Sequence, residues 1–249
     1  MTPAARIALA ALSLCSLLAL WSFLATRYDP VTLPSPSATG GALLALLGDR
    51  GFLVGTLLPS ILRILAGVSL AFAGGTALGL LAGLVPVLRP ILFPVRLTLM
   101  SMPAAVLVVL LLIWTGPTSA TTVIAASVML APVFYVAALD GLAGVDPRLM
   151  EMAAVHRVPW DRRIRAIIAP AVTVAMLPAI RTGAANGIRV TILAEILAGA
   201  GGLGDRIASA RQYLQTDQLF ALIIVVVGLV VILEAGLGYL VSRMRGRLP

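Results

Sequence analysis

Long apolar segments recur along this chain, and they constrain its fold more than any other feature. They lie at about 7–26, 57–85, 97–114, 119–139, 171–198 and 218–241. A helix that spans a membrane needs about 20 mostly apolar residues, so the chain has material for six spans. Because the segments are apolar throughout rather than alternating, they predict helices and not the strands of a barrel. The predicted fold class is therefore all-α, a polytopic membrane protein with about six transmembrane helices.

Composition agrees with this assignment and leaves little room for anything else. Hydrophobic residues make up 60% of the 249 residues and charged residues 11%, against about half and a quarter in soluble domains. After six spans the remaining residues suffice only for ends and loops, so we expect one membrane domain over 1–249. The first segment, 7–26, is longer than the usual apolar region of a signal peptide and lacks a clear cleavage site, so we expect it to be retained.

The basic residues indicate how the chain is oriented. The formal net charge is +8, and all 18 basic residues are arginine. They are spread between apolar segments instead of gathered on one polar face, which argues against nucleic-acid binding. With six spans, the loops on the side of the termini hold most of the arginines, and the positive-inside rule then places both termini in the cytoplasm.

Three segments outside the spans are informative. Residues 30–50 begin with proline and serine and continue with an apolar run too short to span, which predicts an extracytoplasmic loop with an interfacial helix. Residues 140–169 form the main cytoplasmic loop, where a soluble partner is expected to dock. Residues 199–217 open with glycines and predict a polar, partly helical segment on the outer side. Small residues in the second and fifth spans favour close packing, so these two helices are expected to form the centre of the bundle.

The chain offers little for catalysis or for a cofactor. Cys15 and His156 are the only cysteine and histidine, which excludes a metal cluster, and no catalytic triad or paired carboxylates in a polar pocket can be found. A phosphate-binding GxxxxGK[ST] loop needs a lysine, and the chain has none. We therefore expect no enzymatic activity, no cofactor and no metal in this chain.

The loop at 140–169 contains a recognisable pattern. It reads Glu151-Met-Ala-Ala-Val-His-Arg157 and reaches Pro170 in Ile-Ile-Ala-Pro. This resembles the EAA loop of bacterial ATP-binding-cassette (ABC) importer permeases, although Met152, Arg157 and Ala169 depart from the pattern. Arg157 replaces the usual glycine, which tolerates the backbone angles needed between two short helices. Pro159 is expected to provide that break instead, because proline suits the first turn of a helix and pushes the preceding residue toward extended geometry.

Flanking segments extend the resemblance to residues 30–245. They look like the nitrate, sulfonate and taurine branch of these permeases and occur in the same order: Leu33-Pro-Ser-Pro36, Ser60-Ile-Leu-Arg63-Ile-Leu-Ala-Gly67, Val145-Asp-Pro-Arg-Leu149, and Ala194-Glu195 followed by Gly202-Leu-Gly204. The resemblance implies the type I importer permease fold, in a bacterial inner membrane.

The resemblance also implies partners. These are two cytoplasmic ATPase subunits that bind ATP and Mg²⁺, a second permease subunit in a homodimer or heterodimer, and an extracytoplasmic binding protein that delivers a small, anionic or polar solute. The ATPase-coupling residues carried over from the pattern or argued from its departures are Glu151, Ala153, Ala154, Arg157, Pro159 and Pro170.

Charged residues within the apolar segments are candidates for the translocation path. Each costs roughly 2.5–3.5 kcal/mol at the centre of a membrane helix and therefore faces protein or water. Arg181 and Arg189 lie about 80° apart around one helix and could border one cavity, and Glu195 follows on the same segment. For Arg63 and Glu234 we expect interfacial or interhelical pairs.

Two other functions remain open at this point. A secondary transporter or channel would work without ATPase subunits, but inverted repeats with broken helices, typical of that class, are not evident between the two halves. A membrane-embedded enzyme would need a clustered polar site. The transported solute is not fixed by the sequence, since the resembling branch handles nitrate, sulfonates, taurine, bicarbonate and vitamin precursors.

Overall fold

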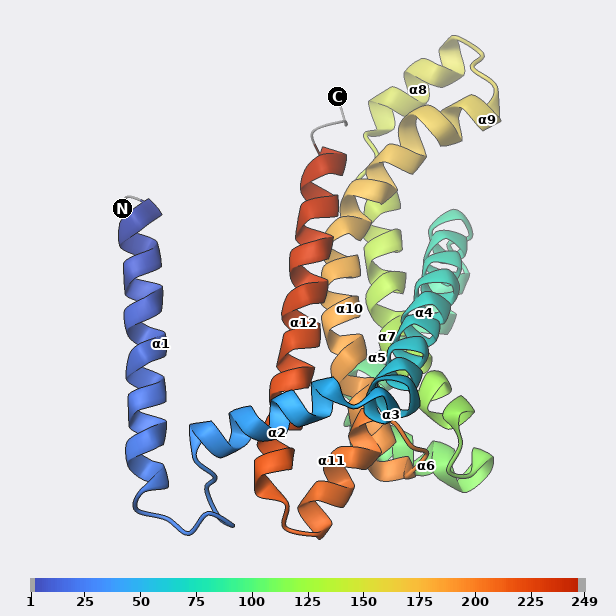
Figure 1. The fold of residues 1–249 in the computed structure, drawn as a ribbon. Helices are drawn as coiled ribbons and strands as arrows, with labels where there is room; N and C mark the ends of the chain where they lie inside the picture. Colours follow the sequence, from blue (N-terminus) through green and yellow to red (C-terminus); the bar gives the residue numbers. More distant parts are fainter. Residues whose placement is uncertain (1–2, 246–249) are drawn as a thin grey trace.

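The computed structural model describes residues 3–245, and every regular element in that range is helical. Apart from α1, the long helices stand side by side, and shorter helices lie at both ends (Figure 1). The long helices are α1 (Pro3–Ala25), α4 (Leu58–Leu84), α7 (Ser119–Ala143), α10 (Ala169–Ala198) and α12 (Thr216–Arg245). The all-α prediction is confirmed.

Within the described residues, four helical stretches are long and apolar enough to cross a membrane. They are Arg50–Leu84, Ser119–Ala143, Trp160–Ala198 and Thr216–Tyr239. The first runs from α3 (Arg50–Phe52) through the π-helical turn η1 (Leu53–Leu57) into α4. The first predicted span, 7–26, lies in α1, where the apolar helix Ala11–Ala25 is shorter than these four.

The third predicted span, 97–114, differs from the structure. It is divided between α5 (Leu88–Ser101) and α6 (Ala104–Thr115), which meet at 105°. Met102 between them is extended, at φ −74° and ψ 129°, because a proline at the next position disfavours helical geometry. Only the pair taken together can be counted as a fifth span.

Small residues set the packing at the centre of the bundle. α4 lies along α7, and α7 lies along α10. Gly75 and Gly79 of α4 face the carbonyls of Ala131 and Tyr135 on α7 so closely that a Cβ atom would collide with them. The prediction that the second and fifth spans form the centre therefore missed α7, whose own alanines and Gly141 let both neighbours approach.

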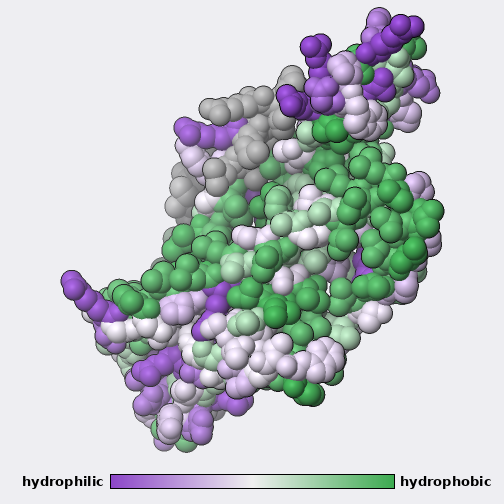
Figure 2. Space-filling model, turned by 90° about the vertical axis from the view of Figure 1, so that its right-hand side faces the viewer, coloured by the Kyte–Doolittle hydropathy of each residue, from purple (hydrophilic) through white to green (hydrophobic). Residues whose placement is uncertain are grey.

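The two ends of the molecule differ in what they carry. The start of α1, the end of α12 and the short helices α8 (Pro147–Val155) and α9 (Trp160–Arg163) lie at one end (Figure 1). α2 (Pro36–Gly48) and α11 (Leu203–Gln212) lie at the other end, and α2 runs across the long helices as an interfacial helix would. Figure 2 shows an apolar band between two ends rich in hydrophilic residues, as expected for a chain embedded in a bilayer.

α1 stands apart from the other long helices over most of its length (Figure 1). α1 is attached to the rest of the chain near its C-terminal end. There the Trp21 indole N–H donates to the Pro34 carbonyl at 3.0 Å, and the Trp21 ring lies 5.7 Å from the Phe220 ring. Most of the described side chains farther along α1 are exposed. Their apolar character means that lipid or another protein chain covers them.

Candidate functional site

The segment predicted to couple to an ATPase projects beyond the bundle as two short helices. Asp146 caps α8 by accepting from the backbone N–H of Arg148 at 2.9 Å, and Pro147 occupies the first turn. α9 continues through the π-helical turn η2 (Ile164–Ile168) into α10, where Pro170 stands in the first turn. Because α10 continues from η2, where the Ala169 N–H donates to the Ile164 carbonyl five residues back, the wider turn leaves room for a proline that has no N–H to donate.

The turn between α8 and α9 is built around Arg157. This residue adopts a left-handed backbone conformation with φ 52°. The Val158 N–H donates to the Ala153 carbonyl at 2.8 Å, and the Arg157 N–H donates to the Ala154 carbonyl at 3.0 Å. These two bonds form a Schellman motif, in which glycine usually occupies the left-handed position.

The prediction that Pro159 replaces the missing glycine is therefore corrected. Arg157 itself takes the conformation that glycine would have, at a cost of roughly 1–2 kcal/mol for a residue with a Cβ. Pro159 has a different role, because it immediately precedes α9 with φ −63° and ψ 150°. Arg163 stabilises the same turn by donating from Nε to the Val158 carbonyl at 2.8 Å.

The two short helices present a mixed apolar and charged surface. Ala153 is buried, whereas Glu151, Ala154 and Arg157 are exposed. Exposed apolar side chains surround them, namely Leu149, Met152, Val155 and Trp160. Exposed apolar groups next to charged ones are typical of an interaction surface.

A polar cavity of about 440 Å³ lies between α10 and α12. It is lined by Arg181, Thr182, Ala185, Asn186, Arg189 and Glu234. The structure therefore brings two of the three predicted path residues, Arg181 and Arg189, to one cavity. It adds Glu234, for which the sequence predicted an interhelical pair.

The charges of this cavity are not paired with one another. Within residues 3–245, neither arginine nor Glu234 lies within ion-pair distance of an opposite charge. Among the described residues, the Arg189 side chain makes one hydrogen bond, in which Nη1 donates to Asn186 Oδ1 over a long distance of 3.4 Å. Arg181, Arg189 and Glu234 are all exposed on the surface of the chain. Charges at this depth cannot face lipid without a large penalty, so water, solute or another protein chain must cover them.

Glu195 lies elsewhere, in a second charged cluster near the end of α10 that leads into α11. Its side chain is 0% exposed, and Arg63 of α4 donates from Nη1 to its Oε1 at 2.8 Å. The Ser60 hydroxyl and the Gly204 N–H also donate to the carboxylate, at 2.8 Å and 2.9 Å. Glu195 is thus fully engaged and does not line the polar cavity.

Arg63 holds the glycine-rich loop that follows α10. It donates to the carbonyls of Ala200 and Gly201 at 2.8 Å and 2.7 Å, and to the Ser119 hydroxyl at the start of α7. Gly201 and Gly202 take positive φ values of 75° and 98°, and a Cβ on Gly202 would collide with Glu195. The expected pair for Arg63 is confirmed, with Glu195 as its partner. The sequence placed Arg63 in one motif and Glu195 with Gly202 in another, but it gave no sign that the two motifs meet.

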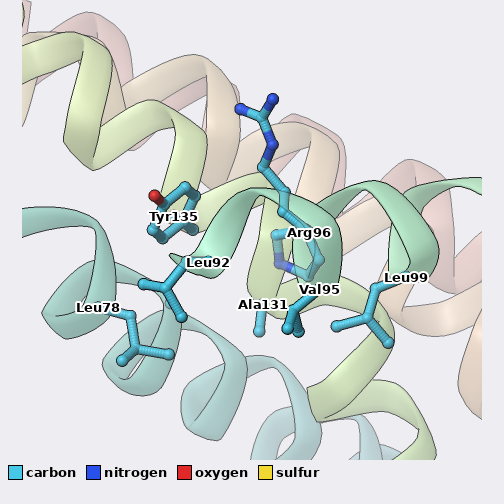
Figure 3. A pocket seen from close by; sticks show the side chains of 9 residues that line it. Leu78, Leu92, Val95, Arg96, Leu99, Ala131 and Tyr135 are labelled. Carbon is cyan, nitrogen blue, oxygen red and sulfur yellow. The ribbon is translucent and has the colours of Figure 1, made fainter. Parts of the chain in front are cut away.

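A smaller pocket of about 60 Å³ lies between α4, α5 and α7. Figure 3 shows Leu78, Leu92 and Val95 lining it, while the Arg96 guanidinium extends away from the leucines. The lining surface of this pocket is apolar, so it offers neither the polar partners that a water needs nor a site for a charged solute. Arg96 therefore belongs to a different environment from the arginines of the polar cavity.

Comparisons with known proteins agree with this arrangement. A family described as "Binding-protein-dependent transport system inner membrane component" matches residues 75–246. The taurine transport system permease protein TauC of Escherichia coli (strain K12) is 29% identical over 241 residues, which cover 93% of this chain and 86% of that protein. The putative aliphatic sulfonates transport permease protein SsuC of Bacillus subtilis (strain 168) is 31% identical over 175 residues, which cover 70% of this chain and 63% of that protein.

Solved structures are similar at the level of fold. Two inward-facing structures of the MetNI methionine ABC transporter match with a TM-score of 0.63 and 16% sequence identity. The match covers 77% of this chain and 94% of the other. Together with the family match, this similarity confirms the predicted type of membrane fold.

Proposed function

The chain belongs to the family of binding-protein-dependent transport system inner membrane components, and we propose that it forms the path by which a small sulfonate enters the cell. Its function is that of the membrane-spanning permease subunit of an ABC importer. The polar cavity with Arg181 and Arg189 carries the proposal for the solute, because guanidinium groups bind oxyanions through several parallel hydrogen bonds. The names of two relatives, which specify taurine and aliphatic sulfonates, support the same solute class.

Energy for transport comes from partners in this proposal. Membership of the family implies ATPase and binding-protein partners. We assign two ATPase subunits, which hold ATP and Mg²⁺, while this chain is non-catalytic and carries no cofactor. The lack of lysine in the sequence, and hence of a phosphate-binding loop, supports this division of labour.

The ATPase subunits dock on α8 and α9. Their exposed apolar side chains, with Glu151 and Arg157 beside them, form a surface that a soluble partner can cover. Ala153 and Ala154 provide the carbonyls that close the turn, and Pro159 precedes α9. Pro170 lies in the first turn of α10, and α10 continues from α9 through η2. Because the helical stretch is continuous, a displacement of α9 also moves α10.

Both termini are assigned to the cytoplasm of a bacterial cell, with the chain in the inner membrane. The start of α1 and the end of α12 lie at the same end as α8 and α9 (Figure 1). That end carries the arginine-rich loops, and the positive-inside rule favours a cytoplasmic location for them. The single domain of 1–249 then presents α2 and α11 to the binding protein on the outside.

A second permease subunit completes the path. Arg181, Arg189 and Glu234 lie on the surface of the single chain at membrane depth, where lipid would be an unfavourable neighbour. A homodimer or a related heterodimer that places this face on a shared axis would enclose the cavity in protein and water. The exposed apolar length of α1 offers further surface to the same partner.

Reconstitution in proteoliposomes tests the proposal. The chain, its ATPase and its binding protein should together take up labelled taurine only when ATP is supplied to the ATPase side. Vesicles without the ATPase serve as the control and should show no uptake. Uptake that proceeds without the ATPase would support a secondary transporter or channel instead.

A further inference from the structure

The polar cavity holds charges of both signs in a fixed order. The Arg181 guanidinium occupies the space beside Gly238 of α12, where a Cβ atom would meet its Nη2. Glu234 lies one helical turn from Gly238 toward the outer end, a rise of about 6 Å. Arg189 lies about 12 Å from Arg181 in the same direction along α10. The carboxylate of Glu234 is therefore placed between the levels of the two arginines.

None of these three side chains has an ion-pair partner in the part of the chain that the structure describes. By contrast, Glu195 on the same helix α10 pairs with Arg63 of α4 at 2.8 Å, so α10 does hold a closed ion pair with a neighbouring helix elsewhere along its length. Open charges of both signs in one cavity are suited to binding rather than to holding helices together.

A solute with a single negative charge satisfies this cavity incompletely. Its anion could bind Arg189 and the Asn186 amide, whose oxygen already accepts from Arg189. The Glu234 carboxylate would then remain unpaired close to a second negative charge. An added ammonium group on the solute would pair with Glu234 and remove that repulsion, while the anion stays on the arginines.

We propose that the cavity selects small zwitterions, in which a sulfonate or carboxylate and an ammonium group are joined by a short chain, over the corresponding plain anions. Glu234 is the specificity-determining residue, and Arg189 with Asn186 receives the anionic group. The proposal rests on the proposed function and separates the two solute types that its relatives' names specify, since taurine has an ammonium group and a simple alkane sulfonate lacks one. Selection would then occur in the permease as well as in the binding protein.

Equilibrium binding to the full-length chain in lipid nanodiscs tests the inference without ATP or partners. Labelled taurine is the probe and ethanesulfonate, which differs by the missing amino group, is the competitor. The native chain should bind taurine at least tenfold more tightly than ethanesulfonate. Glu234→Gln should bring the two affinities within about twofold of each other, and Arg189→Gln should weaken both.

Two control variants lie outside the cavity. Asp217→Asn removes a carboxylate from the first turn of the same helix α12, and Arg96→Gln removes an arginine from α5. Both should leave the affinity ratio unchanged. Equal affinity for the two probes in the native chain, no binding of either, or a ratio that survives Glu234→Gln would overturn the inference.

The proteoliposome assay separates this failure from failure of the proposed function. ATP-driven uptake of both probes, with no dependence of their ratio on Glu234, removes only the selection of zwitterions. Absence of ATP-driven uptake of either probe removes the sulfonate import on which the inference rests.

Discussion

α10 contributes to two groups of charged side chains, one with Arg63 of α4 and one with Glu234 of α12, and their surroundings are opposite in kind. At the outer end, Glu195 is 0% exposed and is bonded to Arg63, Ser60 and the backbone of the following loop. Nearer the middle, Arg181 and Arg189 are exposed beside Glu234 and have no ion pair in the described residues. The residue types are the same, so the difference lies in what surrounds them. A closed network holds helix ends together, whereas open charges remain available to a solute.

The largest expected effect comes from opening the closed network. Arg63→Leu leaves the Glu195 carboxylate buried without its counter-charge, which costs about 3–5 kcal/mol when one member of a buried pair is removed. We expect a large drop in the thermal unfolding midpoint of the purified protein and in folded yield. Arg181→Leu, a matched change in the open group, should alter neither by a comparable amount.

The double variant Arg63→Leu with Glu195→Leu sharpens this result. Replacing both charges removes the unpaired carboxylate, so part of the lost stability should return. If Arg63→Leu and Arg181→Leu proved equally harmful to the unfolding midpoint, the distinction between closed and open groups would be lost.

The next largest effect is a loss of transport with no loss of folding stability. Arg189→Gln should reduce ATP-driven uptake of taurine about tenfold, equivalent to about 1.4 kcal/mol, because it removes a charged donor for the solute. The unfolding midpoint should stay within a few degrees of the native value, since Arg189 makes only one long hydrogen bond. Arg96→Gln is the control and should keep uptake intact. A large drop in the thermal unfolding midpoint of Arg189→Gln would mean that Arg189 stabilises the fold, as Arg63 and Glu195 do.

A third set of charges, on α8, extends the comparison beyond the membrane. Glu151 lies on α8 and is exposed, and α8 projects beyond the bundle together with α9 (Figure 1). Glu151→Arg should weaken association with the ATPase several-fold by placing the opposite charge in the interface, while membrane insertion stays normal. Asp205→Arg at the other end of the molecule should leave association unchanged. Co-purification of the ATPase measures both, and normal solute-stimulated ATP hydrolysis in Glu151→Arg would remove the case for this contact.

The smallest expected effect lies in the turn between α8 and α9. Arg157→Gly should relieve the left-handed strain and stabilise the turn by about 1 kcal/mol, and it should cost ATPase association only the contact that the Arg157 side chain makes. Pro159→Ala should be close to neutral, because the Schellman bonds end α8 before this residue. Hydrogen exchange of the loop and co-purification check both variants. Loss of association in Pro159→Ala alone would restore the account in which proline makes the break.

The long helices could be predicted from the sequence, because hydropathy alone marks them. Helices cover the six apolar segments, and the glycines of α4 pack closely as their spacing indicated. The bend between α5 and α6 was missed because the apolar run continues through Pro103, and hydropathy is insensitive to the backbone restriction that proline places on Met102.

The site residues were predictable in part, for reasons of geometry. Arg181 and Arg189 share a cavity because eight residues on one helix return nearly to the same face. Glu234 could not be placed with them, since its depth depends on how α12 packs against α10. Glu195 was assigned to the path because its partner Arg63 lies 132 positions away in the chain. The left-handed angle at Arg157 was also hidden, because residues with a Cβ rarely adopt it.

The continuity of α9 with α10 has a mechanical consequence. Trp160–Ala198 is one stretch of 39 residues, interrupted only by the change of winding at η2. At 1.5 Å per residue this rod is about 58 Å long. We take the Ala198 end of this rod as fixed by the Arg63–Glu195 network. A tilt of about 10° then displaces the Trp160 end by about 10 Å and the backbone at Arg189 by only a few ångströms. Under the proposed function, the Arg63–Glu195 network would act as the pivot, the proposed ATPase would displace the far end of the rod, and only a small displacement would reach the proposed solute cavity.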